Sequence, residues 1–119
     1  MNRPEVHQAG IRDVDFGARV KIVEPCNLYG CKIGDDCFVG HGVMFINDTF
    51  SSGAPAGGRK ELWRETVIGN RVSIGSNATI MPVRIVDDVV IGAGSVVTKD
   101  ITTPGTYAGN PARRLLAGN

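Results

Sequence analysis

The chain has few aromatic residues and few cysteines. The first shortage excludes an aromatic core, and the second argues against a fold held together by disulfides or zinc. Only 6% of its 119 residues are aromatic while 42% are hydrophobic, so the core must consist mainly of aliphatic side chains. The cysteines, Cys26, Cys31 and Cys37, are odd in number and have no CxxC spacing. This pattern argues against a disulfide framework or a zinc site, and it predicts buried, reduced thiols.

The chain also has no excess of charge of one sign and no long apolar run. Its 13 basic and 12 acidic residues give a net charge of +1, so nothing points to nucleic acid or a membrane surface as a partner. No apolar run approaches the roughly 20 residues that span a bilayer, and the start, MNRPEVHQAG, lacks an apolar signal-type segment. We therefore expect a cytoplasmic protein.

What the chain does have is an aliphatic residue at every sixth position, often followed by glycine. A helix would need apolar residues three and four positions apart, so this spacing indicates a solenoid of short strands instead. The leading residue should point inward, and the small fifth residue should fill the corner beside it. The leading positions are Phe16, Ile22, Leu28, Ile33, Val39, Phe45, Ile68, Ile74, Ile80, Ile85, Ile91 and Val97, and the fifth positions are Cys26, Cys37, Val43, Ala78, Val89 and Ser95.

The repeats predict one all-β domain over residues 1–119. Six residues on each of three faces give about eighteen residues per coil and roughly four coils. Two repeats, LYGCK at 28–32 and IMPVR at 80–84, are one residue short, so those corners must close differently. An irregular insertion occupies about residues 49–65. Because so short a stack leaves much side surface exposed, we expect an oligomer.

The hexapeptides and the tail SVVTKDITTPGTYAGNPARRLL together resemble the hexapeptide-repeat acyltransferases, over about residues 16–116. This resemblance implies a left-handed parallel β-helix that forms a homotrimer and binds acetyl-CoA between subunits, with no metal. The coenzyme A end would be residues 97–116, because VVTKD followed by GNPAR is similar to the family's motif. By this resemblance the cofactor-binding residues are Ser76, Ala93, Thr98, Lys99 and Arg113. Leu116 stands where a second cation is expected.

A second motif suggests the acceptor. The run VGHGVMFINDTF, the insertion and ELWRETVIG are most similar to enzymes that N-acetylate nucleotide-linked amino sugars in surface-polysaccharide and lipopolysaccharide biosynthesis. Insertions in solenoids often form a binding wall. Arg59 and Lys60 are candidates for contact with a nucleotide diphosphate, Trp63 for stacking on a ring, and Glu65 for a further substrate contact.

The candidate catalytic residues are Asn47, Asp48 and His41. Sugar O-acetyltransferases of the superfamily keep a histidine base where Asn47 and Asp48 stand here. Asparagine accepts no proton usefully, whereas a sugar amine is partly neutral near pH 7 and needs mainly to be positioned. Asn47 or Asp48 would then hydrogen-bond the amine or the sugar hydroxyls.

Three other functions compete with this interpretation. A sugar O-acetyltransferase would use His41 as its general base. A non-catalytic β-helix could serve only as a partner surface, although the coenzyme A motif argues against it. A γ-type carbonic anhydrase on the same fold needs about three histidines for zinc, and the chain has only His7 and His41.

Overall fold

The computed structural model describes residues 2–7, 10–57, 59 and 64–116. In this part of the chain every regular element is a strand, most of them two or three residues long. The strands are β1 (Ile11–Phe16), β2 (Lys21–Ile22), β3 (Leu28–Ile33), β4 (Phe38–Val39), β5 (Met44–Phe45), β6 (Thr66–Ile68), β7 (Ser73–Ile74), β8 (Thr79–Ile80), β9 (Arg84–Ile85), β10 (Val89–Ile91), β11 (Val96–Val97), β12 (Gly105–Gly109) and β13 (Ala112–Arg114).

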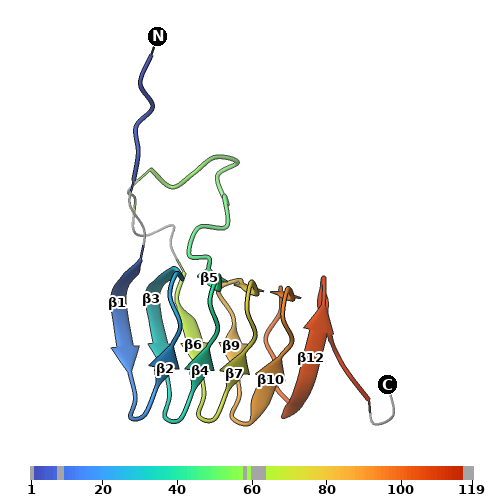
Figure 1. The fold of residues 1–119 in the computed structure, drawn as a ribbon. Coiled ribbons are helices and arrows are strands. Elements are labelled where there is room, and N and C mark those ends of the chain that lie inside the picture. The colour runs from blue at the N-terminus through green and yellow to red at the C-terminus, as the bar shows by residue number, and fades with distance from the viewer. Residues whose placement is uncertain (1, 8–9, 58, 60–63, 117–119) are drawn as a thin grey trace.

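The strands form three sheets that run side by side along the solenoid (Figure 1). Their orders are β1-β3-β6-β9, β13-β12-β10-β7-β4-β2 and β11-β8-β5. Every pairing is parallel except that of β12 with β13 at the end of the stack. The fold is therefore an all-β parallel β-helix, which confirms the predicted class.

One coil contains 17 residues, not the eighteen expected from three full hexapeptides. Asn70 contacts Asp87 on the next coil at a separation of 17 positions. The pairing of β7 with β10, Ser73 beside Val90, has the same spacing. The reason is that a coil includes one of the shortened repeats, 28–32 or 80–84, so one of its three corners closes with one residue fewer.

The interior is the column of aliphatics that the repeat predicts. The leading residues from Leu28 to Val97 are all buried, and so are the fifth-position residues, including the polar Ser95. Phe16 is the clear exception, with 42% of its surface exposed. It lies on β1, the outermost strand of its sheet, so no further coil covers it.

The three cysteines are free and buried, which confirms the prediction of reduced thiols. Burial away from water raises the pKa of each thiol because it disfavours the thiolate. The effect is largest at Cys31, whose pKa rises to about 12, with Glu65 and Asp15 adding unfavourable negative charge. These thiols are therefore packing residues and not nucleophiles.

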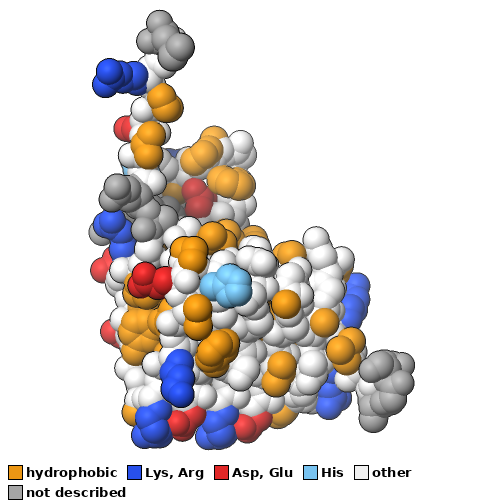
Figure 2. All heavy atoms as spheres, viewed as in Figure 1, with side chains coloured by type: hydrophobic (Ala, Val, Ile, Leu, Met, Phe, Trp, Pro, Cys, Tyr) orange, Lys and Arg blue, Asp and Glu red, His pale blue; other side chains and the backbone are white. Residues whose placement is uncertain are grey.

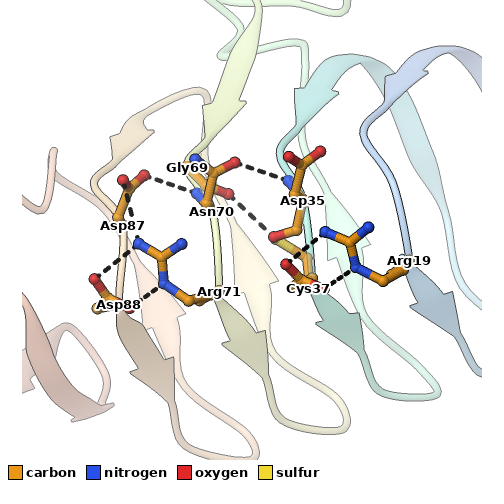
Figure 3. A network of polar contacts seen from close by, with 9 residues as sticks. Arg19, Asp35, Cys37, Gly69, Asn70, Arg71, Asp87 and Asp88 are labelled. Carbon is orange, nitrogen blue, oxygen red and sulfur yellow. Dashed lines mark hydrogen bonds and ion pairs between the residues drawn. The ribbon is translucent and has the colours of Figure 1, made fainter.

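Hydrogen bonds from backbone N–H groups to side-chain oxygens tie successive coils together at one corner (Figure 3). The backbone N–H of Ala18 donates to Asp35 Oδ1 at 2.8 Å, that of Asp35 to Asn70 Oδ1 at 2.8 Å, and that of Asn70 to Asp87 Oδ1 at 2.7 Å. Gly34 makes this approach possible, because a Cβ there would lie 2.6 Å from the Gly69 carbonyl oxygen. The corners are thus stacked with no room for a side chain at this position.

Ion pairs run beside this ladder on the outer rim of the same corner. Arg19 pairs with Asp36, and Arg71 pairs with Asp88. All four residues have φ between 55° and 61°, the left-handed conformation that turns the corner. The hydrogen bonds from the arginines lower the pKa of Asp36 and of Asp88. Figure 2 shows the result as alternating blue and red side chains along the lower edge.

Replacing Asn70 by alanine should lower the free energy of unfolding by about 1 kcal/mol, because the Asp35 N–H then loses its acceptor between two coils. Urea denaturation measures the change. Asn70→Asp is the matched control: it keeps the acceptor oxygen, and Asp already occupies the equivalent positions 35 and 87. Equal stability of Asn70→Ala and the wild type would show that the ladder does not stabilise the fold.

Candidate active site

The insertion leaves the coils after β5 and returns through a narrow neck. The backbone N–H of Arg64 donates to the Asn47 carbonyl at 2.9 Å, so the two ends of the loop are joined. Across the insertion, hydrogen-bonded residues such as Asp35 and Asn70 are 35 positions apart, yet they stack as closely as residues in uninterrupted coils. The loop is therefore an addition to the solenoid that does not disturb its register.

Asp48 anchors the first part of this loop. Its Oδ1 accepts a hydrogen bond from the Phe50 N–H at 3.0 Å, and its Oδ2 accepts one from the Ala56 N–H at 2.6 Å. Ala56 is only 2% exposed, so the loop folds back to bury it. Both carboxylate oxygens are thus engaged by backbone. The structure favours a loop-holding role for Asp48 over the catalytic role considered from the sequence.

A cleft of about 520 Å³ lies beside the neck. It contains two of the predicted residues, Asn47 and Glu65, together with residues that the sequence analysis did not single out. In Figure 1 the loop projects from the coils on the side where β1 begins. The lining residues are Arg12, Asp13, Tyr29, Gly30, Asn47, Arg64 and Glu65.

The first strand enters the cleft because β1 and β3 are both kinked there. Arg12 lies beside Tyr29 in the register of the two strands. At the next position Asp13 has φ 55° and Gly30 has φ 46°, so the two strands turn together. Gly30 lies in a shortened repeat, which was the one hint in the sequence of irregular backbone here. Nothing in the repeat pattern marked Arg12 or Tyr29.

Two cations, two carboxylates and one phenol ring therefore meet at this cleft. Such a mixture suits a polar ligand that carries both an anionic group and hydrogen-bonding groups, and the ring offers an apolar face. Of the predicted loop residues, Arg59 is exposed and its backbone N–H and Nε both approach the Ala56 carbonyl, at 3.2 and 3.4 Å. Lys60 and Trp63 lie outside the described residues.

A second cleft, of about 220 Å³, gathers three of the five predicted cofactor residues. Thr98 and Lys99 follow β11, and the hairpin of β12 and β13 brings Arg113 to the same place, opposite Ala108. Arg114 also lines this cleft, which places a second arginine there although position 116 holds leucine. Lys99, Arg113 and Arg114 are all exposed. The cleft is thus a cationic groove at the end of the solenoid.

The other two predicted cofactor residues, Ser76 and Ala93, lie with His41 on a different corner. These three residues follow β4, β7 and β10 on successive coils. The backbone N–H of Asn77 donates to the His41 carbonyl at 2.9 Å, and that of Gly94 to the Ser76 carbonyl at 2.9 Å. His41 Nδ1 is 3.2 Å from Ser76 Oγ. In the single chain, His41 does not line the cleft that contains Asn47.

Among residues 2–7, 10–57, 59 and 64–116, no three His, Cys, Asp or Glu side chains are grouped so that they could hold a metal ion. In the same residues, no helix has the length and apolar character needed to cross a bilayer.

Comparison with known proteins identifies the class. A family model described as "Hexapeptide repeat of succinyl-transferase" matches residues 65–99. A serine acetyltransferase of Helicobacter pylori is 32% identical over an alignment 98 positions long, and the match covers 72% of this chain and 57% of that protein. A maltose O-acetyltransferase from Clostridium difficile 630 has a TM-score of 0.74 and 29% identity, and the match covers 87% of this chain and 58% of that one.

A galactoside acetyltransferase solved in complex with coenzyme A has a TM-score of 0.67 and 32% identity, over 90% of this chain and 56% of that one. The fold thus defines a hexapeptide-repeat β-helix. The family model and these relatives support membership of the hexapeptide-repeat acetyltransferase family. The chain spans little more than half the length of each relative named here.

Asp48→Ala should free the loop while leaving the coils unchanged, because two backbone N–H groups lose a charged acceptor. Hydrogen exchange followed by mass spectrometry should show amides in residues 49–57 exchanging about tenfold faster or more. Peptides from 66–97 serve as the internal control, and Asp48→Asn, which keeps one carbonyl oxygen, should lie between. Unchanged exchange in Asp48→Ala would mean that other contacts hold the loop.

Proposed function

We propose that the protein is an acetyl-CoA-dependent acetyltransferase that acetylates the amino group of a nucleotide-linked amino sugar. The observation that carries the finer part of this proposal is the presence of Asn47 in the larger cleft, at the point where the chain leaves the coils. An amide there can orient a nucleophile but cannot take its proton. The acceptor must then be a group that is already nucleophilic when neutral, such as an amine.

The groove at the end of the solenoid fits the donor. Coenzyme A carries three phosphates, and Lys99, Arg113 and Arg114 are exposed cations lining one small cleft. The exposed Ala93 offers little bulk beside the extended arm of the donor. Acetyl-CoA supplies a thioester, whose carbonyl accepts the nucleophile. The structure of a galactoside acetyltransferase with coenzyme A supports this choice of donor.

The larger cleft fits the acceptor. Arg12 and Arg64 can bind a diphosphate, Tyr29 can pack against a ring, and Glu65 can accept a hydrogen bond from the amine. Asn47 would hold the amine so that its lone pair attacks the thioester carbonyl. The carbon–sulfur bond then breaks, and the proton lost by nitrogen passes to the departing sulfur. The reaction needs no metal and no permanent base in this scheme.

We propose a homotrimer as the working form. The outward positions of the coils carry exposed apolar side chains, among them Phe38, Met44 and Val90. Hydrophobic side chains are visible between polar ones across the face drawn in Figure 2. A neighbouring subunit that packs on such a face would bury them. It would also place a second chain beside the corner that carries His41.

A second candidate is an O-acetyltransferase acting on a sugar or related alcohol. It is favoured by the similarity to a maltose O-acetyltransferase and to a serine acetyltransferase, both of which are named for hydroxyl or amino-acid acceptors. In this case His41 would be the general base. The two candidates differ in whether a titrating base is needed.

The donor site is tested by Lys99→Ala and Arg113→Ala. Each should weaken coenzyme A binding in isothermal titration calorimetry by roughly 1 to 3 kcal/mol, because a charge-assisted contact with phosphate is lost. Lys21→Ala removes a lysine that is also exposed, from β2 near the opposite end of the solenoid, and should not change the affinity for coenzyme A. Removing the 3′-phosphate from the ligand should weaken binding to the wild type, and less so in whichever variant lacks that contact. Full affinity in both variants would refute the groove as the donor site.

The acceptor is tested by offering nucleotide-linked amino sugars and their hydroxyl analogues together with acetyl-CoA and a thiol reporter. We expect turnover of the amines, with a rate that rises with pH as the substrate amine loses its proton. Asn47→Ala should lower kcat/KM for that amine by about tenfold, the effect of losing one positioning hydrogen bond. Turnover of hydroxyl acceptors alone would establish the O-acetyltransferase instead.

A further inference from the structure

We propose that His41 is a positioning residue for Ser76, whose hydroxyl it orients toward the donor, and not a general base. This inference rests on the proposed function, since it assigns Ser76 to the acetyl-CoA site. It differs from the O-acetyltransferase scheme, in which His41 would itself take the proton of the acceptor. The observation behind it is the short contact between His41 Nδ1 and Ser76 Oγ, 3.2 Å across adjacent coils.

The contact depends on how tightly the two corners stack. A Cβ at Gly40 would lie 2.8 Å from the Ser76 backbone nitrogen and 3.0 Å from Ser76 Oγ, so only glycine fits before His41. Gly75, before Ser76, is confined in the same way, because its Cβ would lie 2.6 Å from the Ala93 nitrogen. The glycines thus bring His41, Ser76 and Ala93 into one column. The column runs along the solenoid toward the coil from which the donor groove is built.

The backbone fixes both partners independently of their side chains. The His41 carbonyl accepts from the Asn77 N–H, and the Ser76 carbonyl accepts from the Gly94 N–H, each at 2.9 Å. Each Cα is therefore held, and the side-chain contact decides only the rotamer of Ser76 and the direction of its hydroxyl. Ser76 is half-buried whereas His41 is exposed, so the imidazole forms the outer cover of the pair.

The Ser76 hydroxyl can contact His41 and a ligand at the same time. It has one donor and two acceptor positions, and His41 Nδ1 uses one of them. The remaining positions stay available to a ligand lying along the column. The contact uses Nδ1 and not Nε2, but in the single chain His41 does not line the larger cleft, where the acceptor is proposed to bind.

The test is a double-mutant cycle on coenzyme A affinity, measured by calorimetry, together with kcat. His41→Ala should weaken binding about 2- to 5-fold and Ser76→Ala about 3- to 10-fold, the range of one neutral hydrogen bond. In the Ser76→Ala background, His41→Ala should have no further effect, because the hydroxyl that the imidazole contacts has gone. His7→Ala, a second exposed histidine near the N-terminus, is the matched control and should match the wild type.

Rescue by a conservative variant separates orientation from proton transfer. His41→Asn can place an amide atom near the position of Nδ1 and should keep coenzyme A affinity and kcat within about twofold of the wild type. A general base would instead lose 10²- to 10⁴-fold in kcat in this variant, with little change in affinity. Additive effects in the double variant, or a failure of asparagine to rescue, would overturn the inference.

One readout does not depend on the donor at all. In a long-range ¹H–¹⁵N spectrum of the free protein, Ser76→Ala should shift the Nδ1 resonance of His41 and leave that of His7 in place. An unchanged Nδ1 resonance would overturn the inference even if coenzyme A binds. Absence of coenzyme A binding by the wild type, with the Nδ1 shift present, would instead refute the acetyltransferase proposal and with it the role of the pair in donor binding.

Discussion

The parallel hydrogen-bonding register between successive coils is the constraint on which the rest of this structure depends. Residues stack on their equivalents 17 positions away in uninterrupted coils and 35 positions away across the insertion, so the same corner is repeated along the solenoid. Corners can stack this closely only where backbone faces backbone, as at Gly34 and Gly69. Side chains at the corners must then either fill the interior or bond to the next coil, as the Asp35, Asn70 and Asp87 ladder does.

Because of this repetition, side chains on equivalent corners of successive coils form columns along the solenoid. One corner carries the charged ladder, which only holds coils together, while another carries His41, Ser76 and Ala93. The two clefts lie where the backbone is irregular. The larger cleft lies between the ends of the inserted loop and the kinked first strand, and the cationic groove is formed at the terminal hairpin. Regular coils thus set the distances between sites, and departures from regularity create the hollows that can bind ligands.

The same division explains how much could be predicted from the sequence. The period of six identified the strands, the interior positions and the small corner residues, because each depends on local spacing alone. Phe16 occupies a leading position but is exposed, because burial also needs a coil on each side and β1 lies at the edge of its sheet. The coil length differed by one residue because shortened repeats close one corner differently.

The candidate site was harder to predict. Thr98, Lys99 and Arg113 line one cleft and Asn47 and Glu65 line another, and their binding roles stay predictions. Arg12 and Tyr29 were missed because their place depends on the pairing of β1 with β3 around two left-handed residues. Asp48 looked like a functional residue but binds two backbone N–H groups of its own loop, contacts that no spacing reveals.

The neck between the Asn47 carbonyl and the Arg64 N–H makes the loop a replaceable part. Since the coils on either side keep their stacking across it, a loop of another length or composition can be exchanged there without cost to the β-helix. Asn47, Arg64 and Glu65 line the larger cleft at the two ends of the loop, so a change in the loop acts beside that cleft and leaves the cationic groove at the far end as it is. In evolutionary terms, a scaffold of this kind can change the surroundings of one cleft through its loop while it keeps the other cleft.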